Sequence, residues 1–297
     1  MAEAVLRAPR EEELHGLAGR LALDGLLEVA CPLDPAADAR VAELGGQVVG
    51  TCWVRVVSSL TVFSADGTEA YIEGHVEPAH RGCGIGTALL RWAVARARAT
   101  GTVREVFTDA GSADGAPLLA AAGFRPGPVI QVMEHDHPAA VVAPGWPAGT
   151  RLELRRGGDE LVDAVVTACD RVFADLEGYR GATRPVVARV LAHPSSDPAL
   201  CLLAARGREV VGLCYCRLER SGGTLGGWVE DLGVAPSARG IGLGRALLWE
   251  GLRGLAAAGA GSVLLGVDAA NTTARSLYQS SGFRLASELA RYRLVLG

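Results

Sequence analysis

The stretch VAPSARGIGLGRALL, residues 234–248, decides the fold of this chain, because a second copy, VEPAHRGCGIGTALL, occupies residues 76–90. In each copy a segment of strand character enters and a segment of helix character leaves. The duplication therefore predicts two copies of one domain. Nine of the fifteen positions are identical: Val76/Val234, Pro78/Pro236, Arg81/Arg239, Gly82/Gly240, Gly84/Gly242, Gly86/Gly244, Ala88/Ala246, Leu89/Leu247 and Leu90/Leu248.

Each copy predicts an anion-binding loop. Alternating glycines allow a tight turn in which backbone N–H groups converge beside the positive end of the following helix dipole. This arrangement suits a phosphate or a pyrophosphate. A tight strand-to-helix connection without a ligand is the alternative for a single copy, and the repetition weakens it. The dinucleotide-binding fingerprint fits poorly, because the spacing is G-x-G-x-G.

Length and composition indicate a two-domain globular protein. The 297 residues fit about two domains of roughly 150 residues each. With 49% hydrophobic and 21% charged residues the chain has ample material for a core. No stretch approaches the ~20 apolar residues of a membrane span. The first residues, MAEAVLRAPREEE, lack the apolar segment of a signal peptide. We therefore expect a cytoplasmic protein that does not bind membranes.

The charged residues and the cysteines exclude several functions. Every basic residue is Arg, so neither a catalytic Lys nor a G-x-x-x-x-G-K-[ST] nucleotide loop is present. The net charge of −4 gives no case for nucleic-acid binding. The seven cysteines lack metal-ligand spacing, so we expect reduced, buried thiols and no metal site. Cys214 and Cys216 should face the same side of one strand.

Hydrophobic periodicity predicts an α/β fold in each half. The Pro-, Gly- and Ala-rich stretch 137–150 is typical of a linker, so we expect domains at 1–138 and 150–297, each with a mixed, mostly antiparallel sheet flanked by helices. The first half should contain helices at 11–29, 86–100 and 116–122, and strands at 39–44, 48–57, 69–76, 103–108 and after Gly123-Phe124. The second should contain helices at 159–176, 184–193, 244–258 and 272–281, and strands at 201–205, 209–218, 227–234, 262–267 and 290–296.

A second motif, DAANTTARSLYQSSGF, occupies residues 268–283 of the second half. Asn271 stands where a helix N-cap is expected, and Tyr278 follows two turns later on the same side of the helix. The succession of strand, R-x-x-G-x-G, helix, strand and N-x6-Y-x3-G-F resembles the GCN5-related N-acetyltransferase (GNAT) superfamily. The resemblance covers both halves, and the tandem arrangement is similar to that of mycothiol synthase-like acetyltransferases.

The resemblance implies acetyl-CoA as the cofactor and assigns roles to individual residues. The loop backbone would hold the pyrophosphate, and a strand end diverging from its neighbour would bond the pantetheine arm. An N–H near Val234 would polarise the thioester carbonyl. Asn271 would contact the cofactor, and Tyr278 would protonate the departing thiolate. The implied cofactor-binding residues of the second half are Leu232, Gly233, Val234, Arg239, Gly240, Ile241, Gly242, Leu243, Gly244, Arg245 and Asn271; those of the first are Val76, Arg81, Gly82, Cys83, Gly84, Ile85, Gly86 and Thr87.

An amine acceptor also needs a base, because an alkyl ammonium cannot attack before it loses a proton. Strand alternation in residues 227–234 places Trp228, Glu230 and Leu232 on one face, and Val229 and Asp231 on the other. The two carboxylates cannot both face the site unless a bulge intervenes. We favour Glu230 as the base, with a solvated strand carboxylate as the alternative. The basic Glu of mycothiol synthase aligns with Trp228, which argues against that activity itself.

The first half keeps the glycine loop and loses the second motif. Aligned on Gly123-Phe124, Leu119 corresponds to Tyr278 and Ser112 to Asn271. We therefore expect the first half to bind CoA without catalysis, or to serve as a scaffold. In the second half, residues 175–179 carry acidic and aromatic side chains that line the acceptor pocket or form a solvated loop.

These observations predict an N-acetyltransferase that moves acetyl from acetyl-CoA to a primary amine of a small molecule by direct attack, with Tyr278 and Glu230 as catalytic residues in the second half. Two alternatives remain open. One is a noncatalytic acyl-CoA-binding regulator, and the other is a protein or peptide N-acetyltransferase.

Overall fold

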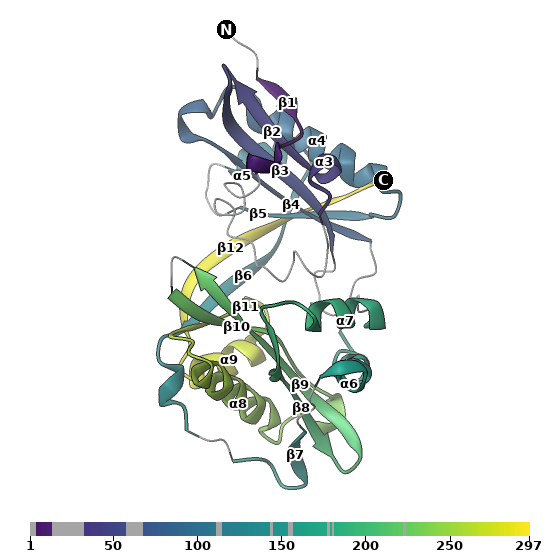
Figure 1. The fold of residues 1–297 in the computed structure, drawn as a ribbon, viewed down its shortest axis with the longest axis vertical. Coiled ribbons are helices and arrows are strands. Elements are labelled where there is room, and N and C mark those ends of the chain that lie inside the picture. Colours follow the sequence, from purple (N-terminus) through teal and green to yellow (C-terminus); the bar gives the residue numbers. More distant parts are fainter. Residues whose placement is uncertain are drawn as a thin grey trace. The chain divides into compact units, whose positions relative to one another are not determined.

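The computed structural model describes residues 4–13, 33–57, 68–110, 115–142, 145–153, 157–176, 179, 181–221 and 224–297. The chain divides into two compact units (Figure 1). Of the described residues, those up to Pro128 together with Leu289–Gly297 form the first unit, and those within Val129–Glu288 form the second. Each unit combines a mixed sheet with helices, so the predicted α/β fold is confirmed.

In the first unit the strand order is β1-β2-β3-β4-β5-β12. All pairings are antiparallel except β4 with β5. Helix α4 packs its apolar side against this sheet, because Leu89, Ala93 and Ala97 recur at helical spacing and are buried. The elements are β1 (Val5–Arg7), α3 (Pro35–Asp38), β2 (Ala39–Leu44), β3 (Gln47–Val57), β4 (Glu69–Val76), the 3-10 turn Pro78–His80, α4 (Ile85–Ala99), β5 (Glu105–Ala110), α5 (Gly115–Ala121) and the end of β12 (Arg284–Val295).

In the second unit the strand order is β6-β11-β10-β9-β8-β7, with only β10 and β11 parallel among the pairings of the described residues. Helix α8 covers one face of the sheet, and α6 and α7 lie on the other (Figure 1). The elements are β6 (Arg125–His135), the 3-10 turn Pro138–Ala140, β7 (Thr150–Glu153), α6 (Gly158–Val172), α7 (Arg184–Leu191), β8 (Ser196–Arg206), β9 (Glu209–Ser221), β10 (Thr224–Val234), the 3-10 turn Pro236–Ala238, α8 (Leu243–Ala257), β11 (Val263–Asp268) and α9 (Thr272–Ser280).

Each unit is completed by the last strand of the other half of the sequence. Residues Ile130–His135 of β6 pair antiparallel with β11, and Ala290–Val295 of β12 pair antiparallel with β5. Arg291 of β12 also donates two hydrogen bonds to Asp109 of β5, at 2.9 and 3.1 Å. The exchange covers edges that β5 and β11 would otherwise expose. The borders of the units therefore differ from the predicted ranges 1–138 and 150–297 at both last strands.

Most predicted elements occur within a few residues of their expected bounds. The helix predicted at 159–176 ends at Val172, however, and the last strand begins at Arg284 instead of residue 290. Most of the helix predicted at 11–29 lies outside the described residues, as do Ser112, Glu177 and Gly178. Across the part of the chain that the structure describes, no helix combines the length and apolar character needed to cross a membrane.

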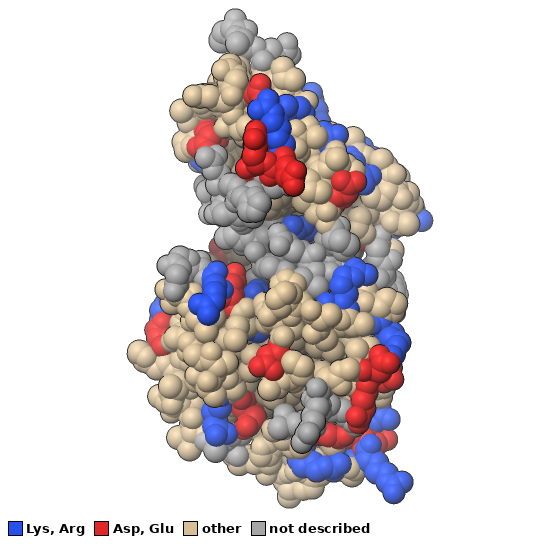
Figure 2. All heavy atoms as spheres, in the orientation of Figure 1, with Lys and Arg blue, Asp and Glu red and all other residues tan. Residues whose placement is uncertain are grey.

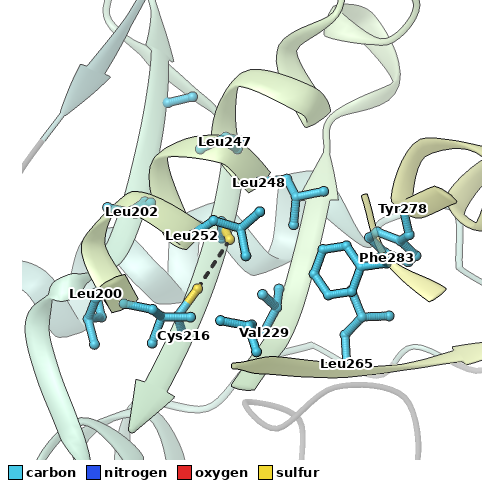
Figure 3. Close-up of a cluster of buried hydrophobic side chains, with 14 of the residues drawn as sticks. Leu200, Leu202, Cys216, Val229, Leu247, Leu248, Leu252, Leu265, Tyr278 and Phe283 are labelled. Atoms are coloured by element: carbon cyan, nitrogen blue, oxygen red, sulfur yellow. Dashed lines mark hydrogen bonds between the residues drawn. The ribbon is translucent and has the colours of Figure 1, made fainter. Parts of the chain in front are cut away.

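The buried cores dominate the stability of both units. Figure 3 shows the core of the second unit, where side chains of β8–β11 meet those of α8 and α9. The surface in Figure 2 instead carries interspersed positive and negative side chains. Some of these form ion pairs within one unit, such as Arg184 with Asp159 at 2.8 Å. Exposed pairs of this kind contribute only about 0–1 kcal/mol each.

The exchange of last strands predicts that a substitution in β6 destabilises the second unit. Met133 belongs to the first half of the sequence, yet its side chain is fully buried in the core of the second unit. Met133→Ala should lower the free energy of unfolding of that unit by about 2–5 kcal/mol, the range for truncating a buried side chain. Hydrogen exchange followed by mass spectrometry should show faster exchange in β10 and β11, while Leu296→Ala should instead affect β4 and β5. Faster exchange in β4 and β5 of the Met133 variant would contradict the observed pairing.

Candidate functional site

The two glycine loops have the same backbone conformation. Gly82 and Gly84 have φ of +76° and +83°, and Gly240 and Gly242 have +80° and +89°. These left-handed conformations turn the chain out of β4 or β10 and into α4 or α8, and glycine adopts them without the steric cost that other residues meet. A Cβ at any of the four would have no heavy atom within 4 Å, so the space above each loop is open.

The leading arginine of each loop ties the turn to the strand before it. Arg81 donates from Nε to the carbonyl oxygen of Val76 at 3.1 Å, and Arg239 donates to that of Val234 at 2.9 Å. Arg239 also donates two hydrogen bonds to Asp175, at 2.5 and 2.8 Å. This pairing lowers the pKa of Asp175 below its usual value. The two arginine side chains therefore stabilise the loop conformations. The backbone N–H groups of the loops remain the groups that can bind a ligand.

Each loop follows a strand that diverges from its parallel neighbour. β10 pairs with β11 only from Gly227 to Val229, and β4 pairs with β5 only from Glu69 to Tyr71. Beyond these residues β10 runs beside β9 alone. The peptide groups of residues 232–234 that do not point at β9 consequently face the gap between β10 and β11. The divergence that the family resemblance implies is present in both units.

A β-bulge in β10 changes which side chains face the gap. Val229 pairs with Cys216 and Asp231 pairs with Tyr215, so Glu230 is an extra residue without a cross-strand position of its own. One inserted residue reverses the alternation of everything after it.

The predicted faces of β10 are therefore wrong. Trp228 and Asp231 lie on the same face, because their partners on β9 are two residues apart. Leu232, expected beside Trp228, instead packs against the core on the α8 side. By strand alternation, Glu230 and Asp231 can approach the same face of β10 only if a bulge intervenes. The structure contains this bulge.

Glu230 forms an ion pair with Arg217, whose side chain is only 1% exposed. Arg217 also approaches Glu219 at 3.3 Å, and its Cζ atom lies 5.8 Å from the centre of the Trp228 ring. A buried guanidinium without a counter-charge is strongly destabilising. Glu230 thus has a structural task in neutralising Arg217, which makes it less suited to accepting a substrate proton.

Asp231 is only 6% exposed, so its carboxylate is buried in the second unit. Burial, followed by the charge of Asp231, raises the pKa of the Cys169 thiol of α6. Strict strand alternation favoured Glu230 over this carboxylate, because only a bulge brings Asp231 to the face of Trp228. The sequence nevertheless contained a signal for Asp231, because the first copy also has a carboxylate, Glu73, three residues before its loop. Both carboxylates pair with an aromatic residue of the preceding strand, Trp53 for Glu73 and Tyr215 for Asp231.

Tyr278 lies near the end of α9 and is 8% exposed (Figure 3). The helix ends in a Schellman motif, in which Phe283 donates its N–H to the Tyr278 carbonyl and Gly282 donates to that of Gln279, both at 3.1 Å. Gly282 has φ of +95°, which explains the glycine of the Y-x3-G-F pattern. Burial, together with the nearby Cys214 and Asp231, raises the pKa of the phenol, so it stays protonated at neutral pH.

Asn271 caps α9, as its position in the sequence predicts. Its Oδ1 accepts a hydrogen bond from the N–H of Ala274 at 3.0 Å. The first unit has the same helix end, with Phe124 donating to the carbonyl of Leu119 at 3.0 Å, but offers an apolar side chain where the second unit offers a phenol. Ser112 lies outside the described residues.

Comparison with known proteins agrees with this geometry. The model of the Acetyltransferase (GNAT) family matches residues 11–124 and 170–283. The chain belongs to the GNAT family. It has two GNAT domains in tandem and is an acetyl-CoA-dependent acetyltransferase that transfers acetyl to an amine.

Relatives and solved structures agree with a tandem arrangement. The chain is 35% identical to a mycothiol acetyltransferase of Thermobispora bispora over 70% of each chain. It is also 35% identical to that of Thermomonospora curvata, over 73% of this chain and 71% of the relative. Its fold is shared with a GNAT protein of Sphaerobacter thermophilus (TM-score 0.76, 23% identity, covering 98% of this chain and 95% of that one). It is also shared with a tandem GNAT protein from the clavulanic acid biosynthesis pathway (TM-score 0.69, 18% identity, covering 100% of this chain and 99% of that one).

Among the described residues, no group of three or more His, Cys, Asp or Glu is placed to hold a metal ion.

The glycines of the second loop make a stability prediction. Gly242→Ala should lower the free energy of unfolding by about 1–2 kcal/mol, because an L-residue at φ +89° is strained. Gly244 lies in α8, and a Cβ there would meet Leu277 at 3.6 Å and Val234 at 3.7 Å, which are ordinary contacts. Gly244→Ala should therefore fold with unchanged or slightly higher stability in urea denaturation. Equal losses in the two variants would contradict this assignment.

Proposed function

We propose that the second unit carries the active site, and that it transfers acetyl from acetyl-CoA to a primary amine of a small molecule by direct attack. One observation carries the proposal. Within Val129–Glu288 an open glycine loop, a diverging strand end, the buried carboxylate of Asp231 and the buried phenol of Tyr278 belong to one compact unit. The first unit has the loop and the divergence, but has Leu119 in place of the phenol.

The loop fits the pyrophosphate of the cofactor. Gly240 and Gly242 leave open space above the backbone, and α8 directs its positive end toward it. Residues 239–245 would hold the pyrophosphate, and the peptide groups of residues 232–234 that face the gap would bond the pantetheine arm. Asn271, at the start of α9, would contact the cofactor as well. When bound, acetyl-CoA supplies the activated acetyl group.

The side chains of the second unit supply the proton transfers. A carboxylate accepts the proton that the ammonium must lose, and the phenol of Tyr278 donates one to the sulfur of the leaving group. The raised pKa of Tyr278 suits a donor, because the proton is retained until negative charge develops nearby. Cys169 and Cys201 are buried, and their thiol pKa values are raised, so neither supplies a thiolate nucleophile. This supports direct attack without an acyl-enzyme.

Two carboxylates are candidates for the base. Glu230 is the one we favoured from the sequence, but its charge is matched by Arg217. Asp231 faces the same side of β10 through the bulge, and its charge acts on the Tyr278 phenol. We place Asp231 first.

Replacing each carboxylate by its amide separates them. Asp231→Asn should lower kcat by roughly 10²–10⁴-fold, the range for a general base. Glu230→Gln should mainly lower the melting temperature, because Arg217 would lose its counter-charge. A kcat loss confined to the Glu230 variant, with its melting temperature unchanged, would restore Glu230 as the base.

Tyr278→Phe should lower kcat by roughly 10²–10⁴-fold. The affinity for acetyl-CoA should barely change, because the phenol acts on charge that develops only as the sulfur departs. Steady-state kinetics together with calorimetric titration of acetyl-CoA measure the two effects. Wild-type kcat in an assay limited by the chemical step would reduce Tyr278 to a packing residue.

Matched substitutions in the two loops test which unit is catalytic. Gly242→Val should abolish cofactor binding in the second unit and with it turnover, because the side chain would extend into the open space above the loop. Gly84→Val carries the same backbone strain in the first loop, where φ is +83° instead of +89°. It should spare most turnover and remove a stabilising effect of CoA on the first unit, which we propose binds CoA without catalysis. An inactive, folded Gly84 variant beside an active Gly242 variant would place catalysis in the first unit.

The acceptor is tested with a panel of amines. The mycothiol acetyltransferases among the relatives point to a small molecule, so the panel should include the amine acceptor of that reaction, other small primary amines and peptides with free N-termini. Turnover with peptides alone would favour a protein acetyltransferase. Binding of acetyl-CoA without turnover of any amine would favour a regulator.

A further inference from the structure

We propose that His135, which the first half of the sequence contributes through β6, is a positioning residue that holds the Tyr278 phenol in the second unit. The inference rests on the proposed role of Tyr278 as the acid. Four observations carry it: the contact of His135 with the helix end, its hydrogen bonds, its ring contact, and the absence of a counterpart in the first unit.

His135 lies directly against the turn that ends α9. A Cβ built on Gly282 would lie 2.9 Å from His135 Nε2, closer than any side chain tolerates. Gly282 therefore meets two requirements at once, a left-handed backbone and the close approach of the imidazole. The side chain of His135 is itself buried, so its ring fills the space that the glycine leaves.

The imidazole is fixed by hydrogen bonds to the backbone of two residues, His137 and Ser281. Nδ1 accepts from the N–H of His137 at 3.3 Å, so the neutral ring carries its hydrogen on Nε2. The ring also hydrogen-bonds the backbone of Ser281, the C-cap of α9. The carbonyl groups at a helix C-terminus lack partners within the helix, and a ring N–H can supply one. Burial lowers the pKa of His135, which favours this neutral form.

A chain of ring contacts leads from His135 to the phenol. The rings of His135 and Phe283 meet edge to face, with centroids 5.3 Å apart and planes at 71°. Phe283 in turn contacts the Tyr278 ring at 5.9 Å between centroids (Figure 3). The backbone makes the same link, because Phe283 donates its N–H to the Tyr278 carbonyl. Movement of the His135 ring would therefore be passed to Tyr278 through Phe283.

The first unit has the same helix end without this support. A Cβ on Gly123 would meet only Leu294 of β12, at an ordinary 3.6 Å. In the first unit the residue that corresponds to Tyr278 is Leu119, whose carbonyl accepts the N–H of Phe124. The imidazole and the phenol are thus present together in one unit and absent together in the other. The helix end forms in both units, so the turn itself does not need the imidazole. The joint occurrence of imidazole and phenol is expected if the imidazole positions the phenol.

The test combines kinetics with a spectroscopic probe. His135→Phe keeps a ring of similar size but removes both hydrogen bonds, whereas His135→Gln keeps an amide N–H that can reach the Ser281 backbone. With acetyl-CoA and the best amine of the panel, the Phe variant should lose about ten- to a hundredfold in kcat, because displacement by about 1 Å can cost ~10²-fold. KM for acetyl-CoA should stay within about twofold, and the Gln variant should recover much of the loss.

Three comparisons make the outcome decisive. His137→Phe, two residues away at an exposed position, is the matched control and should retain wild-type kcat. In a Tyr278→Phe background the effect of His135→Phe on kcat should disappear, because both changes remove one function. In protein labelled with 3-fluorotyrosine, the 19F resonance of Tyr278 should shift or broaden in the Phe variant and return toward its original position in the Gln variant.

The results separate this inference from the proposed function. If Tyr278→Phe lowers kcat but His135→Phe does not, or if the two losses multiply, His135 does not position the phenol and the role of Tyr278 stands. If Tyr278→Phe leaves kcat unchanged, the acid assignment fails and the inference fails with it. An unchanged 19F resonance in a folded His135→Phe variant would overturn the positioning role by itself.

Discussion

The extra residue in β10 is the constraint that decides which side chains of the second unit share a face of its sheet. A strand exposes alternate side chains to alternate faces, so one insertion reassigns every position after it. Because Glu230 bulges, Asp231 turns to the face that carries Trp228, and Leu232 turns into the core below α8. Glu230 in turn neutralises the buried Arg217. The bulge thus brings Asp231 to the face of β10 that carries Trp228, while Glu230 compensates a buried charge.

The two units share one backbone geometry around the glycine loop and differ in the side chains placed on it. Both retain the left-handed glycines, the arginine tie to the strand end and the diverging strand pair. These features depend on backbone conformation, which the repeated loop sequence preserves. The groups that differ are side chains on the same frame, with Leu119 in one unit and Tyr278 in the other. The loop that suits a pyrophosphate is therefore kept in both units, whether the later helix of the unit carries Leu119 or Tyr278 near its end.

The exchange of last strands makes the two halves interdependent. β6 supplies Met133 to the core of the second unit and His135 to the end of α9, although both residues precede the linker in the sequence. β12 supplies Arg291, which holds Asp109 of the first unit. A substitution in one half of the sequence can therefore act on the other unit, and the chain is better described by its compact units than by its sequence halves.

The sequence by itself determined what local interactions control: the strands and helices, the glycine turns, the Asn271 cap and the Gly282-Phe283 helix end. Each depends on residues within a few positions of one another, so periodicity and turn chemistry suffice to find it. Only the tertiary structure decided the bulge at Glu230, the partner of Arg217, the contact of His135 with Gly282 and the unit that each last strand joins. These depend on pairing between residues far apart in the chain, and β-strands carry no local signal for the edge they will cover or for the position of an extra residue.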